Sequence, residues 1–227
     1  MEVVCREEDR PIVSSLFECL SPVSSPSTTF YLAFDDGVLS LCRRGDGSGI
    51  WVEERDIKRR LSGPFLLGRA CGLAPGSAPH VLDATAGLGI DGLALARRGA
   101  RVELTEREPL LWALLRDLLR RLDEPEFSLT RGDSRRSLED PTVYDVVYFD
   151  PMFPPRRKSA LPGKRMQYLS SLLGDSEAFD MDLIQKAQLR ARSRVVLKRR
   201  LKDPVEQQPD WTLRGRSIRY DVYRGLA

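Results

Sequence analysis

The run Asp-Pro-Met-Phe-Pro at residues 150–154 combines side chains that suit chemistry on a flat amine. A carboxylate such as that of Asp150, with a nearby backbone carbonyl, accepts hydrogen bonds from an amine and polarises its nitrogen. Pro151 fixes the backbone beside that acid, and the ring of Phe153 can stack on a planar heterocycle. We therefore take Asp150, Pro151 and Phe153 as candidate catalytic residues.

This run resembles the (Asp/Asn)-Pro-Pro-aromatic motif of enzymes that methylate exocyclic amines of nucleobases. Such an amine is a poor nucleophile because its lone pair is delocalised into the ring. Two hydrogen-bond acceptors held in place by prolines offset that loss, and a flipped base stacks on the aromatic side chain. Transfer is then an in-line displacement that depends mainly on positioning and needs no metal.

Other reaction chemistries find little support among the histidine and cysteine residues. His80 is the only histidine, and it lies just before an expected core strand, a poor place for a general base. The four cysteines form no Cys-x-x-Cys pair, so neither a zinc site nor another metal site is expected. Hydrolase chemistry of the Ser-His-Asp or Cys-His kind is therefore disfavoured.

A glycine-rich turn, Asp-Ala-Thr-Ala-Gly-Leu-Gly-Ile-Asp-Gly at residues 83–92, indicates a nucleotide-binding site. Gly87 and Gly89 let the backbone pass close to a ligand, although the same glycines also fit the dinucleotide fingerprint. Asp83 stands four residues before the first glycine, as in the first motif of class I methyltransferases. Asp83 and Asp91 also suit the cationic sulfonium and ammonium of S-adenosylmethionine (SAM) better than a pyrophosphate. SAM is therefore the expected cofactor.

Two further acids follow expected strands. Glu106 ends the second strand, where an acid accepts both ribose hydroxyls in either of these nucleotide-binding folds. Asp133 and Ser134 follow the third strand, where SAM-dependent enzymes commonly contact the adenine. A plain turn acid after Gly132 is the alternative interpretation of Asp133.

The elements that must position these residues alternate between strand and helix. The pattern predicts strands over 80–84, 101–106, 127–130, 144–149 and 194–198, and helices over 90–98, 109–122 and 180–192. Residues 211–214 and 217–223 form an expected antiparallel pair. We predict an α/β fold of the class I SAM-dependent methyltransferase (Rossmann-like) type, with a parallel sheet and an antiparallel C-terminal strand.

A small β-rich extension precedes this fold. Residues 29–34 and 38–42 read as two strands joined by an Asp-Asp-Gly hairpin turn, and 50–53 as a possible third. Residues 21–27 are rich in Ser and Pro and are expected to form a loop. The predicted division is a small N-terminal β-rich domain over 1–57 and a methyltransferase domain over 58–227.

Basic residues gather in the C-terminal third of the chain. Residues 151–227 hold 17 Lys and Arg against 8 Asp and Glu, although the whole chain carries a net charge of only +3. Two clusters bracket the expected site, and this distribution suits a polyanionic partner such as RNA. The candidate RNA-binding residues are Arg156, Arg157, Lys158, Lys164 and Arg165 in the first cluster, with Lys198 and Arg199 in the second.

The chain has the composition of a globular protein, with 41% hydrophobic residues. No apolar run reaches the about 18 residues that span a bilayer, and the N-terminus lacks the features of a signal peptide. No membrane association is expected, and the cytoplasm is the expected location.

The combined motifs resemble the RsmJ family, bacterial enzymes that methylate the N2 amine of a guanine in 16S ribosomal RNA. The resemblance covers about residues 58–227 and is most specific in the Asp-Pro-Met-Phe-Pro run and the Lys-Ser-Ala-Leu run at 158–161. It implies a small-subunit ribosomal RNA partner. By position it assigns SAM contacts to Ile90, Asp91, Glu106, Arg107, Asp133, Ser134 and Asp150.

This chain departs from the family at a few positions. Ile90 stands where an arginine is expected, and Asp133 stands where a serine is expected. Residues 60–69 are more apolar than the glycine-rich basic stretch of the family, and residues 1–57 match it weakly.

Three alternatives accompany this interpretation. The catalytic run does not separate guanine N2 from adenine N6, so the first alternative is transfer to tRNA or to an adenine in another nucleic acid. The second alternative is an RNA-binding assembly factor with little activity, and the third is a dinucleotide oxidoreductase. The last leaves the run at 150–154 without a role.

Overall fold

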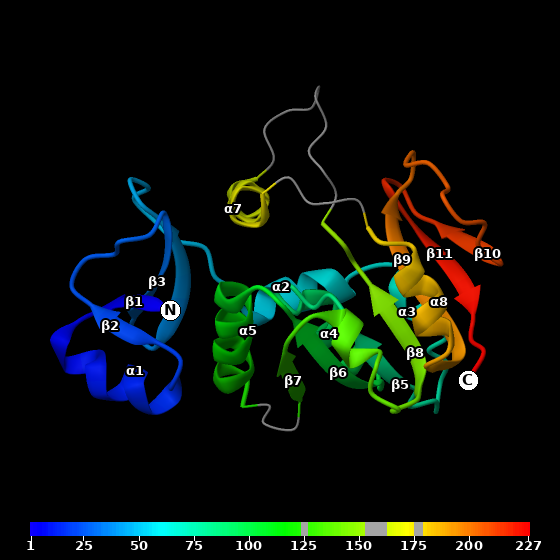
Figure 1. Cartoon of the computed structure of the whole chain (residues 1–227), viewed down its shortest axis with the longest axis horizontal. Helices are drawn as coiled ribbons and strands as arrows, with labels where there is room; N and C mark the ends of the chain where they lie inside the picture. The colour runs from blue at the N-terminus through cyan, green and yellow to red at the C-terminus, as the bar shows by residue number, and fades with distance from the viewer. Residues whose placement is uncertain (124–126, 153–162, 175–178) are drawn as a thin grey trace. The chain divides into compact units, whose positions relative to one another are not determined.

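The computed structural model describes residues 1–123, 127–152, 163–174 and 179–227, and Figure 1 shows its helices and strands. The chain divides into two compact units. The four-stranded unit comprises Met1–Glu53, Glu108–Pro125 and Pro154–Ser176, and the seven-stranded unit comprises Glu54–Arg107, Glu126–Phe153 and Glu177–Ala227. The domain boundary between residues 57 and 58 stays a prediction.

The sheet of the seven-stranded unit has the order β10-β11-β9-β8-β5-β6-β7. Strands β5 to β9 run parallel to one another, whereas β11 is antiparallel to β9 and β10 is antiparallel to β11. This confirms the predicted α/β fold with an antiparallel C-terminal edge. The strands are β5 (His80–Asp83), β6 (Arg101–Glu106), β7 (Ser128–Arg131), β8 (Tyr144–Phe149), β9 (Ala191–Arg200), β10 (Trp211–Arg214) and β11 (Ile218–Arg224).

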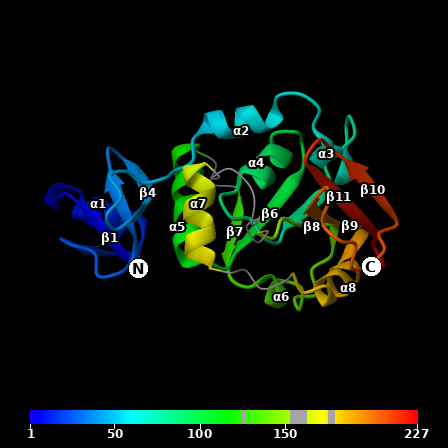
Figure 2. The ribbon, with the colours of Figure 1, turned by 90° about the horizontal axis from the view of Figure 1, so that it is seen from above.

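Helices cover both faces of this sheet, as Figure 2 shows. On one face lie α2 (Glu54–Leu61), α3 (Leu66–Ala70) and α4 (Ile90–Ala96), and on the other lie α6 (Ser134–Ser137) and α8 (Asp182–Gln188). The core under α8 is made of fully buried apolar side chains from β8, β9 and α8, including Val147, Ile184 and Val195. Because both faces are covered, the central strands read as continuous apolar runs.

The four-stranded unit has the sheet order β2-β1-β3-β4. The hairpin predicted at 35–37 is confirmed, since Asp36 and Gly37 both have positive φ, as a tight two-residue turn requires. The elements of this unit are β1 (Glu2–Cys5), a short 3₁₀ turn (Glu7–Asp9), α1 (Arg10–Leu16), β2 (Ser21–Val23), β3 (Phe30–Asp35), β4 (Val38–Arg43), α5 (Pro109–Arg121) and α7 (Lys164–Leu173).

Helix α5 is tied to β4 through a buried acid. Asp117 is fully buried, and its Oδ2 accepts a hydrogen bond from the backbone N–H of Leu39 at 3.1 Å. Arg120 and Arg121 pair with the same carboxylate at 2.8 and 2.7 Å, which compensates for burying its charge. The helix predicted over 109–122 is therefore present, and it packs within the four-stranded unit.

Three local predictions differ from the structure. Ser21–Val23 is a strand rather than a loop, because β1 offers it a parallel partner. Residues 50–53 make only an isolated bridge between Ile50 and Leu41, and α2 begins directly after them at Glu54. The helix predicted over 180–192 covers only Asp182–Gln188, because β9 already begins at Ala191.

Within the described ranges, no helix has both the length and the apolar character needed to cross a membrane. The same residues contain no group of three or more His, Cys, Asp or Glu side chains that is arranged to hold a metal ion.

Candidate active site

The carboxyl ends of three neighbouring parallel strands bring the main acids to one edge of the sheet. Asp83 ends β5, Glu106 ends β6, and Asp150 directly follows β8. The strand order places β5 between β6 and β8, so the ends of these three strands are neighbours. A hydrogen bond of 2.6 Å from the backbone N–H of Asp150 to Oγ1 of Thr85 joins the run at 150–154 to the glycine-rich turn.

The glycine-rich turn is held against β6. Gly87 and Gly89 have φ values of +54° and +75°, a region that L side chains rarely adopt. The N–H of Gly87 donates to Oε2 of Glu106 at 2.6 Å, so this acid shapes the turn as well as facing the ligand edge. A Cβ on Gly87 would meet nothing closer than 4.0 Å, which leaves room beside the backbone for a ligand.

Gly92 serves a different purpose, which is close packing of α4 on the sheet. A Cβ at this position would lie 2.5 Å from Cδ2 of Leu104 and 2.9 Å from Oδ2 of Asp83. Both neighbours are buried, so neither can move aside easily. Only glycine therefore lets α4 begin so near to β5 and β6.

We expect Gly92→Ala to lower Tm by about 2–12 °C, because overpacking a core costs about 1–3 kcal/mol. Alanine favours a helix over glycine by about 1 kcal/mol, which by itself would raise Tm. A fall in Tm therefore reports the steric cost of the added methyl group. Gly47→Ala is the matched control, since a Cβ there meets nothing within 4 Å. Thermal unfolding followed by circular dichroism measures both, and an equal Tm for the two variants contradicts the packing role.

Asp83 lies beneath the turn, with only 1% of its surface exposed. Burial, and then the neighbouring charge of Asp91, raise the pKa of Asp83 well above its usual range. Its Oδ1 accepts a hydrogen bond from the N–H of Thr85 at 3.3 Å. These contacts make Asp83 an organiser of the turn.

Asp91, in the first turn of α4, is surrounded by protein donors. Its Oδ1 accepts from Nε of Arg60, and its Oδ2 accepts from the hydroxyl of Tyr148 at 2.7 Å and from Nζ of Lys198 at 2.8 Å. Burial alone would raise the pKa of Asp91, but Lys198 and Arg60 lower it to about 2. Both carboxylate oxygens are thus occupied, whereas the sequence suggested that this acid meets the cofactor's positive charge directly.

Lys198 and Arg199 do not form the exposed basic cluster that the sequence suggested. The Lys198 side chain is 17% exposed, and its Nζ lies 2.6 Å from Oδ2 of Asp150. Arg199 is 8% exposed and pairs with Glu206. Successive residues of a strand point to opposite faces, so a basic run in sequence is not a basic patch in space.

The first basic cluster lies largely outside the described part of the chain. Phe153, Arg156, Arg157 and Lys158 fall in the range 153–162, which the structure does not describe. Lys164 and Arg165 belong to α7 of the four-stranded unit. There Nζ of Lys164 donates to Ser48 at 2.5 Å, and Nη2 of Arg165 donates to the carbonyl of Trp51 at 2.8 Å.

Asp133 and Ser134 stand at the start of α6, where Asp133 caps the helix by accepting from the N–H of Arg135 at 2.8 Å. Nη1 of Arg107 lies 4.0 Å from the same carboxylate. Gly132, just before, donates its N–H to the carbonyl of Glu106 at 3.0 Å, which joins the ends of β6 and β7. The candidate ribose and adenine residues are therefore neighbours.

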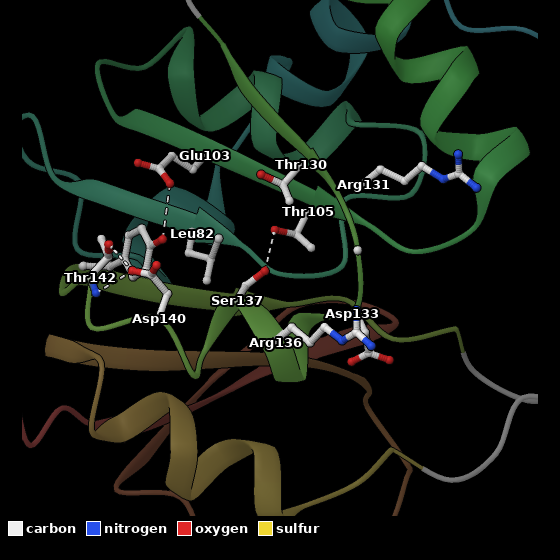
Figure 3. A pocket seen from close by; sticks show the side chains of 12 residues that line it. Leu82, Glu103, Thr105, Thr130, Arg131, Asp133, Arg136, Ser137, Asp140 and Thr142 are labelled. Atoms are coloured by element: carbon white, nitrogen blue, oxygen red, sulfur yellow. Dashed lines mark hydrogen bonds between the residues drawn. The ribbon is translucent and has the colours of Figure 1, made fainter. Parts of the chain in front are cut away.

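A cavity of about 380 Å³ opens beside α6 (Figure 3). Asp133, Arg136 and Thr105 are among the residues that line it, as are Glu103 and Tyr144, whose side chains are joined by a hydrogen bond of 3.2 Å. Its walls include residues of β5, β6, β7, α6 and the start of β8. The cavity shares only Asp133 with the residues proposed from sequence, so we keep it separate from the candidate site.

Sequence reasoning missed Arg60, Tyr148 and Tyr220 as part of the site. Arg60 donates to Asp91 and, through Nη2, to the hydroxyl of Tyr220 at 2.8 Å. A polar side chain near the carboxyl end of an apolar strand is a signal that could have identified Tyr148, the penultimate residue of β8. Lys198, which follows the run Val-Val-Leu in β9, shows the same pattern. Arg60, on an amphipathic helix, carried no such signal.

Comparison with known proteins agrees with this geometry. Residues 25–225 match a family model described as "Putative SAM-dependent methyltransferase". The ribosomal RNA small subunit methyltransferase J of Pseudomonas aeruginosa is 43% identical over 191 residues, which cover 76% of this chain and 72% of that protein. The protein of the same name from Shewanella pealeana is 37% identical over 238 residues, which cover 94% of this chain and 93% of that protein.

Among solved structures, a SAM-dependent methyltransferase from Neisseria gonorrhoeae superposes with a TM-score of 0.80 at 28% identity. The match covers 99% of this chain and 96% of that one. The predicted methyltransferase fold and the predicted cofactor, SAM, are both confirmed by these matches.

Proposed function

This chain belongs to the ribosomal RNA small subunit methyltransferase J family, and on that basis we propose that it methylates 16S ribosomal RNA. The target atom is the exocyclic N2 amine of a guanine, and the methyl donor is SAM. The observation that carries this proposal is the position of Asp150, one residue beyond β8 and hydrogen-bonded to the glycine-rich turn. An acceptor for an amine thus stands beside a turn shaped for a nucleotide cofactor.

The residues of the turn suit SAM. The backbone of Gly87 and Gly89 leaves space for the methionine end, and the first-turn amides of Ile90 and Asp91 can donate to its carboxylate. Since the Asp91 carboxylate is occupied by protein donors, we assign its contact with the cofactor to the backbone.

We assign the ribose and adenine of SAM to residues at the neighbouring strand ends. Glu106 accepts hydrogen bonds from ribose hydroxyls, with Arg107 beside it, and the adenine is held by Asp133 and Ser134. The hydrogen bond from Gly132 to Glu106 supports this assignment because it keeps these two groups adjacent.

In the reaction, SAM supplies an electrophilic methyl group on a sulfonium. Asp150 accepts an N–H of the guanine amine, which turns the nitrogen lone pair towards the methyl carbon and stabilises the positive charge that develops on nitrogen. Pro151 restricts the backbone of this acceptor, and Phe153 stacks on the flipped base. The proton leaves the methylated amine towards Asp150 or solvent.

A methyl-transfer assay over a panel of substrates tests this function. The panel contains small subunits from cells lacking the protein, large subunits, tRNA and DNA, each incubated with methyl-labelled SAM and then digested to nucleosides. We expect label only in small-subunit RNA, as N2-methylguanosine. Label on adenine or on tRNA would overturn the substrate while keeping the enzyme class, and no label on any member would favour an RNA-binding assembly factor.

Since ribosomal subunits are made in the cytoplasm, we place the reaction there.

The basic run after residue 154 is proposed to hold RNA phosphates around the target. We expect Arg156→Ala combined with Arg157→Ala to weaken RNA binding and to reduce the slope of log K against log salt by about 1 for each phosphate that is no longer neutralised. Fluorescence anisotropy at several salt concentrations measures the slope. The pair Arg101→Ala and Arg192→Ala, two exposed arginines on β6 and β9, is the matched control. Equal slopes for the two double variants would remove this role.

A further inference from the structure

We propose that Lys198 is a positioning residue for methyl transfer, which orients the Asp150 carboxylate and couples it to the helix that follows the glycine-rich turn. This inference rests on the proposed function. It concerns a residue that carries no assigned role beyond the RNA contact suggested by its basic neighbours in sequence.

The ammonium of Lys198 bridges two carboxylates. Nζ of Lys198 lies 2.6 Å from Oδ2 of Asp150 and 2.8 Å from Oδ2 of Asp91. One ammonium thus joins the end of β8 to the start of α4, and Lys198 itself is anchored in the middle of the sheet on β9. Because Oδ2 of Asp150 is held by Lys198, we assign the contact with the substrate amine to Oδ1.

Lys198 is less exposed than an ordinary surface lysine. Its side chain is 17% exposed, whereas that of Asp150 is 30% exposed, so the acid faces the ligand edge and the lysine lies behind it. A lysine that served RNA phosphates would extend its ammonium into solvent. Here the carboxylates of Asp91 and Asp150 both lie within hydrogen-bond distance of Nζ, and the long side chain of Lys198 is confined between them.

The charges around Lys198 are balanced. The cluster contains two cations, Arg60 and Lys198, and two carboxylates, Asp91 and Asp150, which compensate one another. The titratable groups around Lys198 are Asp150 beyond β8, Asp91 on α4, Arg60 on α2, Tyr148 on β8, Tyr220 on β11 and the buried Asp83 on β5. Removing Lys198 leaves Asp150 close to Asp91 and Asp83 with Arg60 as the remaining cation.

This environment determines the direction of the pH effect. Burial alone would lower the pKa of Lys198, but Asp150 and Asp91 raise it, so the ammonium stays charged. Burial raises the pKa of Asp150, and Lys198 opposes that rise. Without Lys198 the pKa of Asp150 rises further, so the acidic limb of the pH–rate profile moves to higher pH.

The experiment compares Lys198→Met and Lys198→Arg with the control Lys186→Met, which removes an exposed lysine on α8. Rates of transfer to small-subunit RNA are measured between about pH 6 and about pH 9, and the Kd for SAM is measured by calorimetry. We expect Lys198→Met to lower kcat by about tenfold or more at neutral pH, with recovery at alkaline pH and a change in SAM Kd below about threefold. Lys198→Arg keeps the charge and restores part of kcat.

A loss of kcat that is equal at every pH, or a loss confined to SAM affinity, would overturn the positioning role. So would an unchanged kcat in a folded Lys198→Met protein. If Lys198→Met does not fold, the pH profile of Lys198→Arg decides. The guanidinium of arginine places its N–H donors differently from the ammonium of lysine, so the acidic limb of the pH–rate profile must still shift. Absence of transfer by the wild-type protein on every RNA contradicts the proposed function instead, so the two failures are distinguishable.

Discussion

Replacing Asp150 by alanine is expected to lower kcat for methyl transfer by about 10²- to 10⁴-fold. The variant loses the acceptor that polarises the amine, and no neighbouring carboxylate can take its place. Asp91 has both oxygens occupied by Arg60, Tyr148 and Lys198, and Asp83 is buried under the turn. Single-turnover rates with small-subunit RNA and labelled SAM measure the effect.

Binding of SAM should survive this change. The turn is held by Glu106 and its glycines rather than by the Asp150 carboxylate, so we expect the Kd for SAM to change by less than about threefold. Asp182→Ala, an exposed acid on α8, serves as the control for loss of one negative charge. Near-normal turnover in Asp150→Ala would remove the catalytic assignment, and a lost SAM affinity would move this residue to the cofactor site alone.

Replacing Glu106 by alanine is expected to raise the Kd for SAM by about 10- to 100-fold, because hydrogen bonds to a charged acceptor contribute about 1.5–3 kcal/mol. The variant loses the acceptor for ribose hydroxyls and also the 2.6 Å hydrogen bond that holds the N–H of Gly87. Isothermal titration calorimetry gives the Kd directly. At saturating SAM, kcat should recover most of its wild-type value, since Asp150 is unchanged.

Glu103→Ala is the matched control for this variant. Glu103 lies on the same strand and forms hydrogen bonds with His80 and Tyr144, so its removal also disturbs packing, but away from the strand end. We expect a lowered Tm and an unchanged Kd. A similar loss of SAM affinity in both variants would mean that Glu106 acts through stability and not through the ligand.

The sequence predicted the sheet and its acids because local patterns determine both. Apolar runs that end in Asp83 and Glu106 indicate buried parallel strands, and the carboxyl ends of such strands share one edge. The run at 150–154 follows a third strand of the same kind. From these patterns alone the glycine-rich turn, Glu106 and Asp150 were expected to meet, and the structure brings them together.

The cluster around Asp91 was not predictable in the same way, because it joins residues far apart in the chain. Arg60 lies on an amphipathic helix and Lys198 reads as a member of a basic run, and nothing local says which acid each one meets. The strand β9 continues to Arg200, so Lys198 and Arg199 point to opposite faces of the sheet. Likewise, the buried Asp117 that ties α5 to β4 depends on a hydrogen bond from Leu39 that no periodicity reveals.

The most direct test of the central claim is mass spectrometry of nucleosides from 16S ribosomal RNA of cells that lack this protein. We predict that one N2-methylguanosine is missing, that the wild-type gene restores it, and that Asp150→Ala does not. A full complement of N2-methylguanosine in the deletion strain, or its restoration by Asp150→Ala, would contradict this account.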